Sequence, residues 1–155
     1  MAGAAEIAIE SDTRAADNPV EHASNTRRER GPVSIHPLAV VSPEARLGVG
    51  VKIAAFATVE ADVELGDFCS VGSGAVVKSG VKAGCHNDFA EHAVIGGAPQ
   101  HAARPEHTGR VVIGDHNVFR EFVTIHRALK PGTATVIGNH NYCLLYTSDA
   151  ADDTP

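Results

Sequence analysis

From Ile35 onward the chain repeats a pattern every six residues, and this period restricts the possible fold more than any other feature. Apolar residues occupy fifteen of the eighteen positions reached from 35 to 137 in steps of six, where about eight are expected at 43% hydrophobic content. A period of six residues corresponds neither to the 3.6-residue period of a helix nor to the two-residue alternation of a strand. A fixed period sustained over about a hundred residues predicts hexapeptide repeats wound into a parallel β-helix, in an all-β chain.

A second column of residues supports the first. We call the first residue of each hexad its leader. Four positions after the leader comes a small or aliphatic residue, at Ala39, Ala45, Val51, Ala57, Val63, Cys69, Ala75, Val81 and Ala93. Glycine often follows the leader directly, at Gly48, Gly66, Gly72, Gly96, Gly114 and Gly138. We expect three hexads to close one triangular coil, with both columns inside and glycine helping the backbone to turn.

The repeat divides the chain into three segments. Residues 1–33 are polar, charged and aperiodic, and we expect a disordered lead. Residues 34–142 form the β-helix. Two interruptions, at about 98–110 and 127–135, are expected to be insertion loops, which repeat proteins often place on a binding face. Residues 143–155 abandon the repeat, and we expect them to be a non-native tail.

Composition narrows the class of partner and the compartment. The net charge of −6 argues against nucleic acid as a partner. No stretch approaches the roughly 18 apolar residues needed to span a bilayer, so membrane insertion is not expected. The three cysteines, Cys69, Cys85 and Cys143, match no metal-binding spacing, and the N-terminus lacks the pattern of a secretory signal. These features favour the cytoplasm.

The chain is rich in histidine, with nine in 155 residues. Imidazole is a general base near neutral pH and a common metal ligand. Two chemistries therefore compete. Histidines from neighbouring coils could hold zinc, as in hexapeptide-repeat carbonic anhydrases, or a histidine could serve acyl transfer. For most of the nine, an exposed strand position without chemistry is the simpler interpretation.

One segment distinguishes these alternatives. The pattern IGD-x-N-x-x-R-E-x-VTIHR at 113–127, followed by IGN-x-N at 137–141, resembles the acyl-[acyl-carrier-protein]–UDP-N-acetylglucosamine O-acyltransferases. The segments IHPLAVV at 35–41 and IGGAPQ at 95–100 fit the same family. The resemblance implies a left-handed β-helix and a homotrimer with active sites between subunits. It also implies transfer of a 3-hydroxyacyl group from acyl carrier protein to the 3-hydroxyl of UDP-N-acetylglucosamine, the first step of lipid A biosynthesis, without cofactor or metal.

The same resemblance assigns candidate substrate-binding residues. His126 matches a histidine that lines the family's active-site cleft, and we expect it to contact substrate. Gln100 matches the glutamine of a loop that approaches the sugar nucleotide. The aspartate of that loop is replaced by His101, and either His101 or Arg104 could compensate.

Two further comparisons with the family concern a charged pair and the base. Arg120 and Glu121 match a family pair with either a structural or a functional role. The catalytic histidine falls beyond residue 142: the two expected histidines correspond to Ser148 and Ala151, so no catalytic residue is expected in this chain.

The last residues suggest a reason for the absence of the catalytic histidine. The string CLLYTSDAADD, residues 143–153, resembles the in-frame translation of the transposase adapter used in short-read library preparation. We therefore expect a truncated N-terminal fragment, inactive by itself, of a longer acyltransferase. A native tail would instead favour a non-catalytic scaffold, the third alternative beside the transferase and the zinc carbonic anhydrase-like protein.

This expectation is tested at the level of DNA. Amplification of the source DNA across codon 142, followed by long-read sequencing, should show the frame continuing into further hexads and a His-x-x-His stretch. A native gene that encodes SDAADDTP and then stops would contradict the truncation and favour the scaffold.

Overall fold

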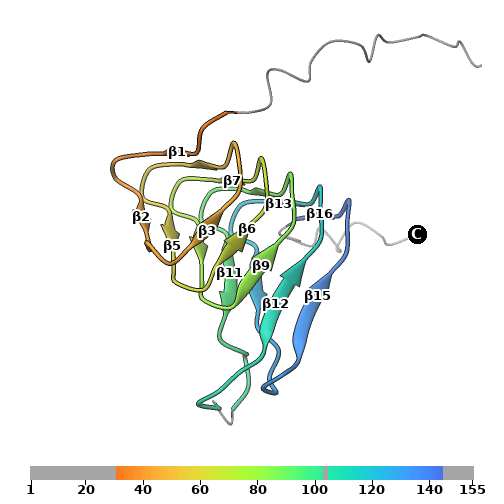
Figure 1. The fold of residues 1–155 in the computed structure, drawn as a ribbon. Helices are drawn as coiled ribbons and strands as arrows, with labels where there is room; N and C mark the ends of the chain where they lie inside the picture. Colours follow the sequence, from red (N-terminus) through yellow and green to blue (C-terminus); the bar gives the residue numbers. More distant parts are fainter. Residues whose placement is uncertain (1–30, 103–104, 145–155) are drawn as a thin grey trace, which may run out of the picture.

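The computed structural model describes residues 31–102 and 105–144. Sixteen short strands run through these residues, and every pairing between strands is parallel. The strands form three sheets, and successive strands along the chain enter the three sheets in turn (Figure 1). The chain therefore winds as a β-helix in which each coil contributes one strand to each sheet. The all-β repeat architecture predicted from the period is confirmed.

The three sheets are numbered by their order along the chain. The first sheet contains β1 (Ser34–Ile35), β4 (Lys52–Ile53), β7 (Ser70–Val71), β10 (Asp88–Phe89), β13 (Val118–Phe119) and β16 (Tyr142–Cys143). The second contains β2 (Val40–Val41), β5 (Thr58–Val59), β8 (Val76–Val77), β11 (Val94–Gly97) and β14 (Thr124–His126). The third contains β3 (Arg46–Leu47), β6 (Glu64–Leu65), β9 (Val81–Ala83), β12 (Arg110–Ile113) and β15 (Ala134–Ile137).

The core lies inside the coils and consists of the two predicted columns. The register pairs leader with leader, as in Ile53 with Val71, so that like side chains stack along the axis. The buried members are Val51, Ile53, Ala57, Val59, Val63, Leu65, Cys69, Val71, Ala75, Val77, Val81, Ala83, Phe89, Ala93, Ile95, Val111, Ile113, Phe119, Val123 and Ile125. Phe89 and Phe119 are fully buried and stacked, with ring centroids 5.2 Å apart. Burial of each large aliphatic or aromatic side chain contributes about 1.5–3 kcal/mol.

The glycines that follow leaders have a different role from the predicted one. Of those named above, only Gly96 has a positive φ, so the prediction that this column turns the backbone is wrong for the others. At Gly48, Gly66, Gly72 and Gly114 the reason for glycine is close approach between coils, whereas a Cβ on Gly138 would meet no atom within 4 Å. A Cβ on Gly66 would lie 2.6 Å from the carbonyl carbon of Gly84, and one on Gly72 would lie 2.8 Å from that of Ala90. Because these obstacles are backbone atoms, no side-chain adjustment can relieve the clash.

The left-handed corner lies two positions further along each hexad. Within the described residues, all eight non-glycine positions with positive φ are the third residue after a leader: Phe56, Asp62, Phe68, His86, His92, His116, Phe122 and His140. Six of these residues stack their rings along the axis. The ring centroids of His86 and His116 are 4.7 Å apart, and those of His116 and His140 are 5.0 Å apart. His92 stacks on Phe122 in the same way. Four of the histidines therefore belong to corner stacks.

A ladder of asparagines links the last described coils. Asn87 and Asn117 are buried polar residues at the position where other hexads have a small apolar one. The side-chain oxygen of Asn87 accepts hydrogen bonds from the backbone N–H and the side-chain amide of Asn117, at 3.0 and 2.9 Å. The oxygen of Asn117 accepts the equivalent pair from Asn141, at 2.9 and 2.8 Å. The ladder therefore ties each coil to the next on both sides of the interruptions.

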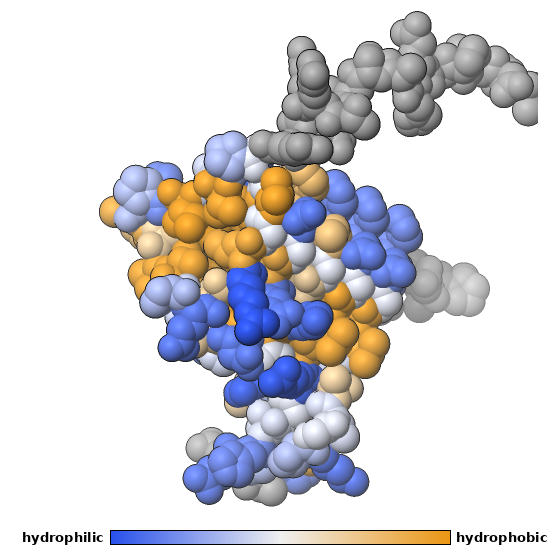
Figure 2. Space-filling view, viewed as in Figure 1, coloured by the Kyte–Doolittle hydropathy of each residue, from blue (hydrophilic) through white to orange (hydrophobic). Residues whose placement is uncertain are grey.

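The two ends of the solenoid differ from its middle. Among the described residues, β1, β2 and β3 each have a sheet neighbour on one side only, as do β14, β15 and β16. The first coil exposes apolar side chains, including Ile35 at 45% and Val40 at 66%, and Figure 2 shows apolar residues gathered over these first strands. The predicted lead lies almost wholly outside the described residues, as does most of the predicted tail, and both stay predictions.

The asparagine ladder yields a stability prediction. Asn117→Ala removes the acceptor of two Asn141 donors and also the side-chain donor to the oxygen of Asn87, and both Asn87 and Asn117 are buried. We expect the free energy of unfolding, measured by urea denaturation, to fall by about 1–3 kcal/mol. Lys52→Ala, on the exposed outer face of β4, is the matched control and should change it by less than about 0.5 kcal/mol. Equal effects of the two substitutions would show that the ladder does not stabilise the coils.

Candidate functional site

Two long connections leave the coils at the same corner, between the second and third sheets. Residues 98–109 join β11 to β12, and residues 127–133 join β14 to β15. Both project from the same end of the triangular section (Figure 1). They are in contact, because the backbone N–H of Gly109 donates to the carbonyl of Ala128 at 2.8 Å. A Cβ on Gly109 would lie 2.8 Å from the carbonyl oxygen of Lys130, so the two connections pack closely at this point.

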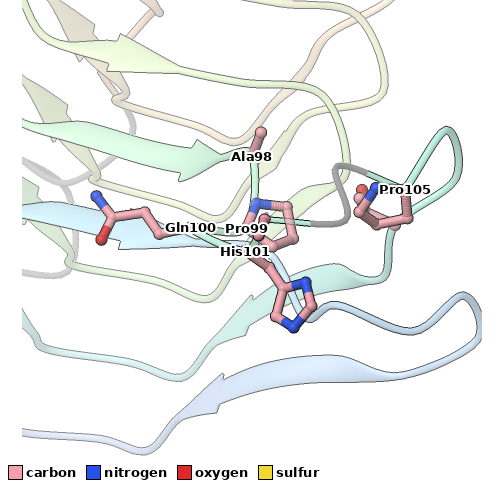
Figure 3. A pocket seen from close by; sticks show the side chains of 7 residues that line it. Ala98, Pro99, Gln100, His101 and Pro105 are labelled. Carbon is pink, nitrogen blue, oxygen red and sulfur yellow. The ribbon is translucent and has the colours of Figure 1, made fainter.

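The first connection borders a half-open cavity of about 540 Å³. Residues 98–102 form one wall, and Pro105 and Thr108 contribute to the other. Gln100 and His101, the two loop residues assigned to substrate from the sequence, both line it, and both are exposed. Figure 3 shows their side chains diverging from Pro99, so that they offer polar atoms in two directions. This volume is within the usual range for small-molecule sites, about 300–1,000 Å³.

His126, the third assigned residue, lies at the end of β14 beside the start of this connection. Its Nδ1 is 2.7 Å from the carbonyl oxygen of Ala98, a residue of the cavity wall. The hydroxyl of Thr135 donates to the backbone carbonyl of His126 at 2.9 Å and holds the end of the strand. The structure therefore joins His126 to the first residue of the loop that carries Gln100 and His101. Sequence reasoning missed the Ala98 carbonyl, for which the paired glycines at 96–97 were the available signal.

Arg120 and Glu121 form an ion pair with one another. The guanidinium of Arg120 donates through Nη2 to Oε1 of Glu121 at 2.7 Å and through Nε to Oε2 at 3.1 Å. The Glu121 carboxylate is the largest cause of a raised pKa for Arg120. The two side chains are 41% and 39% exposed, and the backbone N–H of Arg120 donates to the carbonyl of Cys143 in the next coil. The ion pair thus joins neighbouring residues of one coil, and the backbone N–H of Arg120 provides the link to the next coil.

Two further features concern metal ions and membranes. Within residues 31–102 and 105–144, no three His, Cys, Asp or Glu side chains gather closely enough to hold a metal ion. The carbonic anhydrase alternative places zinc between subunits, and the structure describes a single chain. Sequence similarity therefore bears on this alternative more directly than the search within one chain. In the same part of the chain, no helix has the length and apolar character needed to cross a bilayer.

Six-residue repeats, three parallel sheets and paired connections at one corner define a hexapeptide-repeat β-helix protein. No family model matches the chain. It is, however, 41% identical over 126 residues to the acyl-[acyl-carrier-protein]–UDP-N-acetylglucosamine O-acyltransferase of Xanthomonas oryzae pv. oryzae (strain PXO99A), covering 81% of this chain and 48% of the relative. The enzyme of that name from Stenotrophomonas maltophilia (strain R551-3) is 44% identical over 119 residues, covering 76% of this chain and 45% of the relative. This chain is therefore a partial-length relative of these O-acyltransferases.

Solved structures agree on the fold. The UDP-N-acetylglucosamine acyltransferase from Campylobacter jejuni superposes with a TM-score of 0.63 at 32% identity, over 71% of this chain and 44% of that one. The enzyme from Bacteroides fragilis gives 0.67 at 36% identity, over 70% and 42%. The predicted left-handed parallel β-helix is thereby confirmed. The chain spans about half the length of the relatives it matches, and both relatives are named as O-acyltransferases and not as carbonic anhydrases.

Proposed function

We propose that the full-length parent of this chain transfers a 3-hydroxyacyl group from acyl carrier protein to the 3-hydroxyl of UDP-N-acetylglucosamine, in the cytoplasm, as the first step of lipid A biosynthesis. The observation that carries the proposal is the 41% identity across 81% of the chain to a protein whose name states both substrates. The cavity bounded by the 98–109 connection supports it, because a sugar nucleotide needs a concave site with a few polar groups.

The reaction defines what the site must provide. The sugar hydroxyl oxygen forms a bond to the thioester carbonyl carbon, the carbon–sulfur bond breaks, and the hydroxyl proton passes through a base to the departing thiol. Backbone N–H groups stabilise the negative charge that develops on the carbonyl oxygen. In this proposal the base is a histidine beyond residue 142 of the parent. The 155-residue chain, with Ser148 and Ala151 at those positions, therefore has no catalytic residue.

The three candidate residues take binding roles. Gln100 and His101 contact the sugar nucleotide from the cavity wall, and His101 stands where the family has an acidic residue. His126 contacts the acceptor from the end of β14, next to the same wall. A histidine in place of a carboxylate changes the hydrogen-bond chemistry, because a neutral imidazole can both donate and accept.

The proposal includes a homotrimer in the parent, with active sites between subunits. The outward positions of the second sheet support it: Val40, Thr58, Val76, Val94 and Thr124 form an apolar or β-branched column. The outward column of the third sheet begins with charged residues, because Glu64 accepts from Arg46 at 2.9 Å and pairs with Lys82 at 3.1 Å, and it continues with Val112 and Val136. Association through the second sheet would bury the apolar column and leave the charged ladder in water.

The proposal is tested by assay of the parent and of this chain with acyl-carrier thioester and UDP-N-acetylglucosamine. We expect turnover by the parent and none by the 155-residue chain. In the parent, His126→Ala should lower kcat/KM by about 10- to 100-fold, because one substrate hydrogen bond is lost. His92→Asn is the control, since asparagine tolerates the positive φ of that corner. A parent without transferase activity would contradict the function, and an active 155-residue chain would contradict the missing base.

A further inference from the structure

The contact between His126 and Ala98 determines where the imidazole carries its proton. The Nδ1 atom of His126 lies 2.7 Å from the carbonyl oxygen of Ala98. A carbonyl oxygen has no hydrogen to donate, so the hydrogen bond requires a proton on Nδ1. A neutral ring has only one such proton. Its other nitrogen, Nε2, then presents a lone pair and acts as an acceptor.

A β-bulge places the Ala98 carbonyl over the ring. The register between β11 and β14 pairs Ile95 with Ile125 but Gly97 with His126, so one extra residue, Gly96, is inserted. Gly96 adopts a φ of 85°, a conformation that favours glycine. Gly97 leaves room for the imidazole, because a Cβ there would lie 2.9 Å from Nδ1 and 3.2 Å from Cε1 of His126.

The backbone on both sides of the bulge is held by hydrogen bonds. The N–H of Arg127 donates to the carbonyl of Gly97 at 2.9 Å, while the His126 ring donates to the carbonyl of Ala98. The carbonyls of two consecutive residues at the end of β11 thus accept from two consecutive residues at the end of β14. Because both elements are fixed to each other, the orientation of the ring depends on the bulge and not on packing alone.

The second nitrogen has no partner in the part of the chain that the structure describes. Nε2 of His126 is buried there and makes no hydrogen bond. An unpartnered buried acceptor is unfavourable, and a donor would relieve the cost. Because solvent does not reach Nε2, a ligand donor pairs with it only when the side chains that cover it move aside. A lone pair attracts the hydrogen of a hydroxyl or an amide N–H. It repels the oxygens of a phosphate or of a thioester carbonyl, which are acceptors themselves.

We propose that the Ala98 carbonyl is a positioning group that fixes the proton of His126 on Nδ1, so that Nε2 accepts a hydrogen bond from a hydroxyl or amide N–H of the acyl acceptor. This proposal has two halves. The positioning half, which places the proton on Nδ1, rests on the bulge geometry alone; the ligand half, which names the donor to Nε2, needs a substrate. The ligand half rests on the proposed function, and it specifies that His126 contacts the sugar portion of a sugar nucleotide and not its phosphates.

The positioning half is tested by nitrogen-15 NMR of the imidazole rings in the 155-residue chain, at a pH of about 8, where an ordinary histidine is neutral. Protonated and bare ring nitrogens resonate at well-separated positions. The His126 signals are identified by their loss in His126→Asn, which keeps a donor near the Nδ1 position. We expect a protonated Nδ1 and a bare Nε2. A bare Nδ1 would overturn the proposal whatever the enzymatic activity.

Glycine variants test the cause of this state. Gly97→Ala should displace the ring and shift the His126 signals towards the mixture of tautomers seen for a free imidazole. Gly138→Ala is the matched control, since a Cβ there meets no atom within 4 Å, and it should leave the signals unchanged. An unchanged tautomer in a folded Gly97→Ala variant would overturn the role of the bulge.

The ligand half is tested by titration with UDP-N-acetylglucosamine and, separately, with UDP. We expect the Nε2 resonance of His126 to move with the sugar nucleotide and not with UDP. Movement with both compounds would overturn the assignment to the sugar. If the sugar nucleotide moves no resonance of the chain, substrate binding by these coils fails together with the ligand half, while the tautomer measurement still decides the positioning half.

Discussion

The structure depends on backbone hydrogen bonds that join each coil to the next. The N–H of Ser70 donates to the carbonyl of Asn87 at 2.9 Å, and the N–H of Gly72 donates to that of Phe89 at 2.7 Å, with equivalents on every sheet. Because each coil contacts only its neighbours, the spacing between coils must be the same at every corner. Glycine where coils approach, small residues inside the corners and stacked rings outside them all satisfy this single spacing.

The candidate site exists because two corners interrupt that regularity. Both connections leave between the second and third sheets, where they can pack on one another without disturbing the strands below. β11 and β14 keep their pairing up to Ile95 and Ile125, and the bulge begins only beyond them. The rigid coils therefore support a loop in which Gln100 and His101 are exposed. This division of labour is common in enzymes, where a regular scaffold holds irregular segments that carry the chemistry.

Much of the fold could be predicted from the sequence, because a core position must be apolar in every coil and the period is therefore visible. The role of the glycines could not, since a tight corner and a close approach of two backbones both select glycine. The histidine stacks were equally hidden, because they become neighbours only after winding. At the site, His126 was found through its motif, whereas the Ala98 carbonyl belongs to the backbone and is signalled in the sequence only by the paired glycines at 96–97 that permit the bulge. The assignments of Gln100 and His101 stay predictions, although both line the cavity.

The corner stack of Phe68, His86, His116 and His140 has a consequence for how such a sequence can evolve. Each inner ring touches the ring above and the ring below, although loops of different length separate them along the chain. A substitution at His116 must therefore suit both His86 and His140, and its effect depends on which residues occupy those corners. We therefore expect substitutions at these stacked corners to depend on one another from each coil to the next. The connections between the coils can change length without altering this dependence.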